Sequence, residues 1–165
     1  VEHYTPQHVI DAARRTMGTI DLDPATTELV NTRRVQASFY FTKENNGLGR
    51  HWHGAIFLNP PGGKTKNKSN AVIWWDKLCE EYDSGRVFQA VFVGFSLELL
   101  STTQKSLYWP GEFMFCVPKG RLDFSREVNG EFVVGGAPAH ANIIVYLGPN
   151  VSKFRTEFLS IGKVS

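Results

Sequence analysis

Short apolar segments alternate along this chain with stretches of helical periodicity, and this alternation constrains the fold more than any other feature. Residues 54–58, 87–94 and 142–147 are dominated by apolar side chains. Such short runs are typical of strands that are buried on both faces of a sheet. Strands that alternate with amphipathic helices predict an α/β fold with a mostly parallel sheet and helices on both faces.

Proline, glycine and polar caps mark the ends of the predicted helices. Thr5 is a suitable N-cap, Pro6 suits the first helical position, and Gly18 ends the first helix. Apolar side chains recur at 3.6 spacing over residues 71–82, which predicts a second long helix with Ser69 or the next residue as its cap. Both helices have one apolar face to cover the sheet.

The last third of the chain carries more strand signals than the first. Residues 113–117 and 142–147 read as strands, and Asn129-Gly130 predicts a hairpin turn between them. Residues 153–159 predict a short final helix. This part of the chain therefore predicts an antiparallel edge on the sheet of one 165-residue domain.

Composition is that of an ordinary globular protein, with 42% hydrophobic and 21% charged residues. No apolar run approaches the ~20 residues that cross a bilayer, so we expect no membrane segment and a cytoplasmic location. The net charge of +2 neither indicates nor excludes a nucleic-acid partner. Cys79 and Cys116 have no neighbouring cysteine, which favours two buried thiols over a disulfide.

The segment Asn59-Pro60-Pro61 directly follows the apolar run at residues 54–58. An exocyclic amine of a nucleobase is a poor nucleophile because its lone pair is delocalised into the ring. An asparagine oxygen and a backbone carbonyl can orient such an amine, and proline stiffens the corner and removes a competing donor. The segment suits amine methylation by positioning and preorganised dipoles, or it is a rigid connection without chemistry.

A second polar segment, Asp21-Leu22-Asp23-Pro24, ends a short predicted strand at residues 19–22. Ligands of open α/β sheets gather beyond the carboxyl ends of the strands. If this strand and residues 54–58 are parallel and close together, their tips face one crevice. The sequence therefore predicts a ligand site between the acidic tip, residues 21–24, and the prolyl corner, Asn59-Pro60-Pro61.

Several segments, taken in order, resemble the phage-type DNA N6-adenine methyltransferases, the Dam-like family. The resemblance extends from about residue 4 to residue 147 and depends on the ordered set rather than on one motif. The segments are Tyr4-Thr5-Pro6, residues 20–26, Asn46-Gly47-Leu48 with Trp52 and Gly54, residues 57–61, the helix with Trp75, Lys77 and Leu78, and residues 118–124.

This resemblance implies a single Rossmann-like, S-adenosylmethionine-dependent methyltransferase domain over residues 1–165. It implies methylation of the N6 amino group of adenine in DNA, in a bacterial cell or a phage-infected host. So short a chain leaves little room for target recognition, so we expect relaxed sequence specificity. A cytosine-N4 or RNA amino methyltransferase, or a non-catalytic nucleic-acid-binding domain on a methyltransferase scaffold, are the alternatives.

The resemblance also implies roles for single residues. Asn59, Pro60 and Pro61 would hold the target amine, with Pro60 contributing its carbonyl. Gly62 stands where the family commonly has an aromatic residue that stacks on the base, and the candidates to replace that ring are Trp74, Trp75 and Phe95. The implied S-adenosylmethionine-binding residues are Tyr4, Thr5, Pro6, Asp21, Asp23, Pro24 and Asn46.

A glycine- and lysine-rich stretch follows the prolyl corner and is predicted to be polar and flexible. Its lysines at alternate positions can reach phosphates beside an extruded base, although a solvated loop would have the same composition. The predicted nucleic-acid-binding residues are Gly62, Gly63, Lys64, Lys66 and Lys68. His51 and His53 have no third ligand at a clear spacing, and the other histidines are scattered, so we predict no metal site.

Overall fold

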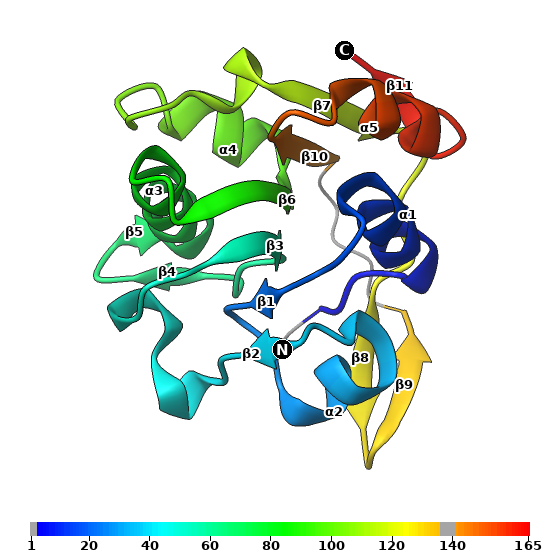
Figure 1. The fold of residues 1–165 in the computed structure, drawn as a ribbon. Coiled ribbons are helices and arrows are strands. Elements are labelled where there is room, and N and C mark those ends of the chain that lie inside the picture. The colour runs from blue at the N-terminus through cyan, green and yellow to red at the C-terminus, as the bar shows by residue number, and fades with distance from the viewer. Residues whose placement is uncertain (1–2, 136–140) are drawn as a thin grey trace.

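The chain folds around a seven-stranded sheet with helices on both faces (Figure 1). The computed structural model describes residues 3–135 and 141–165. The strands are β1 (Leu22–Asp23), β2 (Phe39–Tyr40), β3 (Gly54–Leu58), β4 (Lys64–Thr65), β5 (Lys68–Ser69), β6 (Val87–Phe95), β7 (Met114–Pro118), β8 (Ser125–Val128), β9 (Glu131–Val134), β10 (Asn142–Leu147) and β11 (Gly162–Val164). The α-helices are α1 (Gln7–Met17), α2 (Glu28–Val30), α3 (Asn70–Asp83), α4 (Ser96–Thr102) and α5 (Val151–Phe158).

The sheet has a parallel part and an antiparallel part, in the order β11-β7-β10-β6-β3-β1-β2. Strands β2, β1, β3 and β6 are parallel neighbours, whereas β10, β7 and β11 join by antiparallel pairing. The α/β class is confirmed, the mixed sheet is compatible with a Rossmann-like fold, and its antiparallel part is wider than a single edge strand. Parallel pairing brings the carboxyl ends of β1, β3 and β6 to one edge of the sheet.

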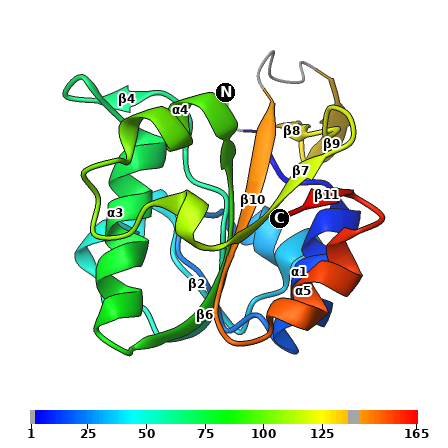
Figure 2. The ribbon, with the colours of Figure 1, turned by 90° about the horizontal axis from the view of Figure 1, so that it is seen from above.

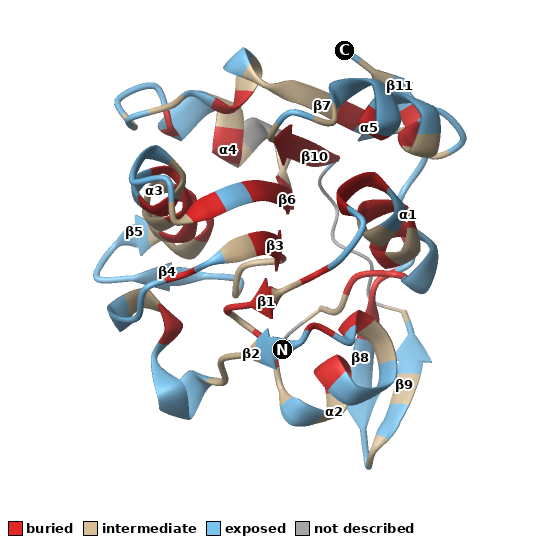
Figure 3. Ribbon diagram, viewed as in Figure 1, coloured by how far each residue is buried: buried red, intermediate tan, exposed pale blue. Residues whose placement is uncertain are grey.

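Helices cover the sheet in two layers. Figure 2 shows α1 and α5 on one face and α3 and α4 on the other. The central strands β3, β6 and β10 are buried over nearly all their length (Figure 3). No helix among the described residues is long and apolar enough to cross a membrane.

The alternation of side chains along the central strands explains why their sequences are apolar without a break. In β3, Phe57 packs into the cluster beneath α1 and α5, and its neighbour Ile56 packs into the cluster beneath α3. Val91 and Phe92 of β6 divide between the same two clusters. Because successive side chains of a strand point to opposite faces, a strand covered on both faces needs an apolar residue at every position.

Several predicted elements are confirmed at their predicted places. The apolar runs at residues 54–58 and 142–147 are β3 and β10. Asn129 and Gly130 both have positive φ and form the tight turn of the β8–β9 hairpin. Helix α1 differs in detail, because Pro6 occupies the N-cap position and Thr5 does not cap the helix.

Two features of the structure were not predicted from the sequence. The stretch after the prolyl corner was expected to be a flexible loop, and it forms the antiparallel β4–β5 hairpin instead. Lys66 and Asn67 make its turn with φ of 50° and 66°. Strand β11 is also unforeseen, because its three residues carry no clear pattern and are ordered by pairing with β7.

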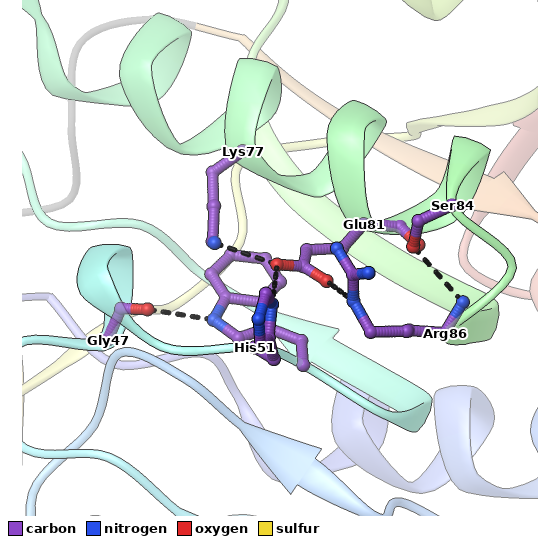
Figure 4. Close-up of polar contacts among 7 residues, drawn as sticks. Gly47, His51, Lys77, Glu81, Ser84 and Arg86 are labelled. Carbon is purple, nitrogen blue, oxygen red and sulfur yellow. Dashed lines mark hydrogen bonds and ion pairs between the residues drawn. The ribbon is translucent and has the colours of Figure 1, made fainter.

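One buried carboxylate, that of Glu81, ties α3 to the segments that precede β3 and β6. Figure 4 shows Lys77, Arg86 and His51 around it, with Nζ of Lys77 at 2.7 Å, Nε of Arg86 at 2.6 Å and Nδ1 of His51 at 3.6 Å from its oxygens. Its side chain is 1% exposed. Burial alone would raise the pKa of Glu81, but hydrogen bonds from Arg86, Lys77 and the Trp52 backbone hold it at about 2.

We predict that Glu81→Gln lowers the free energy of unfolding by about 3 kcal/mol at pH 7, because it leaves a buried ion pair broken. The folded-state pKa of about 2 lies below the ordinary 4.5. The carboxylate therefore stabilises the fold above pH 4.5, and this contribution is lost as the pH falls from there through about 2. Urea unfolding at several pH values measures it, with the exposed neighbour Glu80→Gln as control. An equal loss in both variants would contradict the prediction.

Candidate functional site

A large cavity lies at the carboxyl edge of the parallel strands. Its volume is about 920 Å³, within the range of pockets for cofactors and other small molecules. Its walls come from segments that are far apart in sequence. They are residues 3–5, the end of β1 with residues 24–28, residues 42–48, the prolyl corner, and the start of α3 with Trp74.

Asp23, the last residue of β1, places a carboxylate in this cavity. Its side chain is buried, and it accepts a hydrogen bond from the backbone N–H of Ala25 at 3.1 Å. Burial raises the pKa of Asp23 to about 7, although the Ala25 N–H and the Thr26 hydroxyl oppose that rise. A buried carboxylate with so high a pKa is poised to pair with a cationic group of a ligand.

The wall opposite the corner depends on close backbone packing at Gly47. A Cβ at this position would lie 2.2 Å from the carbonyl oxygen of Pro24, so only glycine fits. The preceding residue, Asn46, adopts a left-handed conformation with φ of 53° and lines the cavity. Trp52 donates a hydrogen bond from Nε1 to the Gly47 carbonyl at 2.9 Å, which fixes the turn from beneath.

The segment before α1 closes one side of the cavity and is held from outside. Tyr4 forms backbone hydrogen bonds in both directions with Ser125 of β8. Arg34 donates to the Thr5 carbonyl at 3.1 Å and to the Ser125 hydroxyl at 3.0 Å, and its guanidinium lies 4.2 Å from the ring centroid of Phe132. These contacts pin the segment to the β8–β9 hairpin.

Thr5 carries an unusual polar atom at this wall. Its side chain is buried, and its Oγ1 has no hydrogen-bond partner among the residues that the structure describes. Leaving a buried hydroxyl unpaired costs about 1–3 kcal/mol. Because Thr5 lines the large cavity, a polar group of a bound ligand can supply the missing partner.

The prolyl corner lies where the large cavity meets a smaller one of about 70 Å³. Nδ2 of Asn59 donates a hydrogen bond to the carbonyl oxygen of His3 at 2.9 Å. A carbonyl partner requires the amide nitrogen on that side, so this bond fixes which way the amide faces. The Oδ1 atom of Asn59 accepts no hydrogen bond from any residue of the described chain and remains available to a ligand.

The structure brings together most of the residues predicted from the sequence. Both cavities are lined by Asn59, Pro61 and Gly62, and the smaller one is also lined by Pro60 and Gly63. The large cavity is lined by five of the residues expected to bind the cofactor. These are Tyr4, Thr5, Asp23, Pro24 and Asn46.

Asp21 and Pro6 lie elsewhere. The carboxylate of Asp21 accepts a hydrogen bond from the Ala55 N–H at 2.7 Å, at the amino end of β3. Gly54 has a φ of 81°, and a Cβ there would lie 2.2 Å from this carboxylate, so Asp21 and Gly54 fit as a packed pair. Pro6 is buried at the start of α1 and lines neither cavity. Both residues therefore have structural roles and lie outside the candidate site.

The three predicted phosphate-contacting lysines lie on the exposed β4–β5 hairpin and line neither cavity. Asn70 fixes the base of this hairpin beside the corner, since its Nδ2 donates to the Gly62 carbonyl at 2.8 Å. Lys68 pairs with Asp76 at 3.1 Å. Lys64 and Lys66 form no ion pair among the described residues and extend from the rim of the site.

The candidate aromatic rings have separate positions. Trp75 is fully buried and donates from Nε1 to the Tyr108 carbonyl, so it belongs to the core. Trp74 lines the large cavity and stacks on Trp52 with ring centroids 5.9 Å apart. Phe95 lines the small cavity together with Phe124, a residue to which the sequence assigned no role.

Both cysteines lie in the hydrophobic core and line neither cavity. Cys79 and Cys116 are buried free thiols, and burial raises the pKa of Cys79 to about 12 and that of Cys116 to about 11. Both thiols therefore stay protonated and unreactive at neutral pH. Within residues 3–135 and 141–165, no three side chains of His, Cys, Asp or Glu gather as a metal site would require.

No protein-family model, curated protein or solved structure matches this chain.

We predict that Asp23→Asn stabilises the protein at alkaline pH. The folded-state pKa of about 7 lies above the ordinary 3.8, so the wild-type carboxyl costs stability progressively as the pH rises between these values. The amide keeps the acceptor for Ala25 without that cost. Thermal unfolding from pH 4 to pH 8 should show a gain on the order of 3 kcal/mol at pH 8 and little difference at pH 4. The exposed Asp123→Asn is the control, and a gain independent of pH would refute the assignment.

Proposed function

We propose that this protein transfers a methyl group from S-adenosylmethionine to the N6 amino group of adenine in DNA, within a Rossmann-like methyltransferase fold. The observation that carries the proposal is the prolyl corner at the junction of two cavities, with the fixed amide of Asn59 at the corner and the buried carboxylate of Asp23 in the larger cavity. An electrophile on one side and an amine on the other would meet at Asn59.

The larger cavity suits S-adenosylmethionine in volume and chemistry. Its volume of about 920 Å³ is ample for a nucleoside with an amino-acid chain. The Asp23 carboxylate would pair with the ammonium of the methionine part, and a nearby positive charge would lower the pKa of that carboxyl. The unpaired hydroxyl of Thr5 and the exposed amide of Asn46 would receive other polar groups. The bound cofactor supplies a methyl group on a sulfonium centre.

The chain's own contribution to the reaction is to hold the amine. Oδ1 of Asn59 and the carbonyl of Pro60 would each accept one hydrogen of the amino group. Two acceptors draw the nitrogen lone pair out of conjugation with the ring and direct it toward the larger cavity. These oxygens would stabilise the positive charge that develops on nitrogen as its bond to the methyl carbon forms and the carbon–sulfur bond breaks, leaving a neutral thioether, and an amino proton would then pass to solvent. No covalent bond to the protein is needed.

The surroundings of the corner support DNA as the substrate. A base in a duplex cannot reach a recessed corner, so it would have to be extruded. Lys64 and Lys66 lie exposed on the hairpin that begins beside Gly63, where they can contact phosphates that flank an extruded nucleotide. Mass spectrometry of nucleosides from DNA of expressing cells tests this directly. N6-methyladenine is expected, whereas N4-methylcytosine, methylated RNA or no product would select one of the alternatives.

We predict that Asn59→Ala abolishes methyl transfer while cofactor binding persists. Removal of a preorganised polar group of this kind costs roughly 100-fold or more in kcat. Calorimetry with S-adenosylmethionine should give an unchanged affinity, because the Asp23 end of the cavity is intact. Ser152→Ala, at an exposed position of α5, is the control. Retained turnover in Asn59→Ala would remove Asn59 from the catalytic role.

We also predict that methylation follows a short target of one or two bases around the adenine. Lys64 and Lys66, the exposed lysines beside the corner, can contact phosphates, which carry no sequence information. Mapping every modified adenine in DNA methylated by the purified protein measures the preference. A required site of four or more bases would contradict it.

A further inference from the structure

The small cavity beside the prolyl corner has apolar walls and a polar edge. Phe95, Phe124 and Val93 supply apolar surface. The polar side chains that line the cavity are His3, Asn59, Ser69, Glu98 and Asn142. The cavity is about 70 Å³, which holds several water molecules or the edge of a flat ring rather than a whole nucleotide. It shares Asn59 and Pro61 with the larger cavity, so a group bound in one is presented to the other.

Ser69 is placed as a helix cap but does not act as one. It occupies the N-cap position of α3, where a serine oxygen normally accepts a hydrogen bond from a backbone N–H of the first turn, and it makes no such bond. Its Oγ is buried and has no partner among the described residues. Nδ1 of His3, at the same cavity, is also buried without a partner.

Two unpartnered polar atoms in one cavity point to a ligand that completes them, because native structures rarely leave such atoms unpaired. Both atoms can donate a hydrogen bond. In adenine, the carbon that bears the amine lies between N1 and the side of the ring with N7, and both nitrogens are acceptors. Donors beside an amine-binding corner therefore match the edge of adenine that carries its amine.

We propose, on the basis of the function proposed above, that the small cavity binds the amine-bearing edge of the acceptor base and that the Ser69 hydroxyl donates a hydrogen bond to a ring nitrogen beside the amine. Phe95 and Phe124 then provide the apolar contacts that Gly62 cannot. Ser69 is thereby a specificity-determining residue for the base.

A combined protein and substrate series tests the role of Ser69. Wild-type protein and Ser69→Ala are assayed on oligonucleotides that contain adenine, 1-deazaadenine or 7-deazaadenine at the target position. Ser69→Ala is expected to raise KM for the adenine oligonucleotide roughly tenfold, which is the effect of one neutral hydrogen bond. One deaza analogue should show a similar loss with the wild-type protein and no further loss with Ser69→Ala.

The melting temperature of Ser69→Ala and a control variant at another serine complete the test. Ser69→Ala should not lower the melting temperature, because the hydroxyl has no partner to lose. Ser152→Ala, on the exposed side of α5, should change neither KM nor stability. Two results would overturn the role of Ser69. One is a melting temperature that falls in Ser69→Ala as it would for a lost helix cap. The other is an increase in KM from Ser69→Ala that multiplies independently with the increase from each of the two analogues. If the wild-type protein methylates no adenine oligonucleotide, the proposed function fails and this inference with it.

Discussion

The parallel pairing of β1, β3 and β6 is the constraint on which the rest of the site depends. Leu22 of β1 pairs with Ile56 of β3, and Leu58 of β3 pairs with Phe92 of β6. This register brings the ends of the three strands to one edge and buries both faces of the centre. A slip of one residue would reverse every side chain of a strand, so burial on both faces protects the register.

The site at that edge is assembled from segments that lie far apart in the sequence. The amide of Asn59 is oriented by the His3 carbonyl, and the segment around His3 is held by Arg34 and Ser125. The orientation of Asn59 therefore depends on the β8–β9 hairpin, although the hairpin lies outside the main sheet. A polar group stabilises a transition state best when it is held rigidly in place. The remote contacts of Arg34 and Ser125 therefore have a role in the proposed chemistry.

The two buried carboxylates, Glu81 and Asp23, have different surroundings. Glu81 is surrounded by Lys77, Arg86 and His51, so it stays ionised and stabilises the fold. Among the described residues, the Ala25 N–H and the Thr26 hydroxyl donate hydrogen bonds to Asp23, and burial raises its pKa to about 7. The Glu81 carboxylate is paired within the protein, whereas the Asp23 carboxyl faces the large cavity.

Features that depend on a few consecutive residues could be predicted from the sequence alone. The apolar runs fixed β3 and β10, Asn129-Gly130 fixed a hairpin turn, and Asn59-Pro60-Pro61 marked a rigid corner at the end of a strand. Each of these follows from the conformational limits or burial of a few consecutive residues.

Which polar residues face the cavities depends on how the elements pack, and the sequence does not show it. Asp21 and Asp23 look equivalent in the sequence, yet Asp21 binds the start of β3 while Asp23 enters the large cavity. Ser69 and Thr5 both stand where the sequence predicts a helix N-cap, and the side chain of neither one caps its helix. The physical reason is that a polar side chain bonds to whatever partner packing brings near it, and strand pairing and helix docking supply those partners from distant parts of the chain.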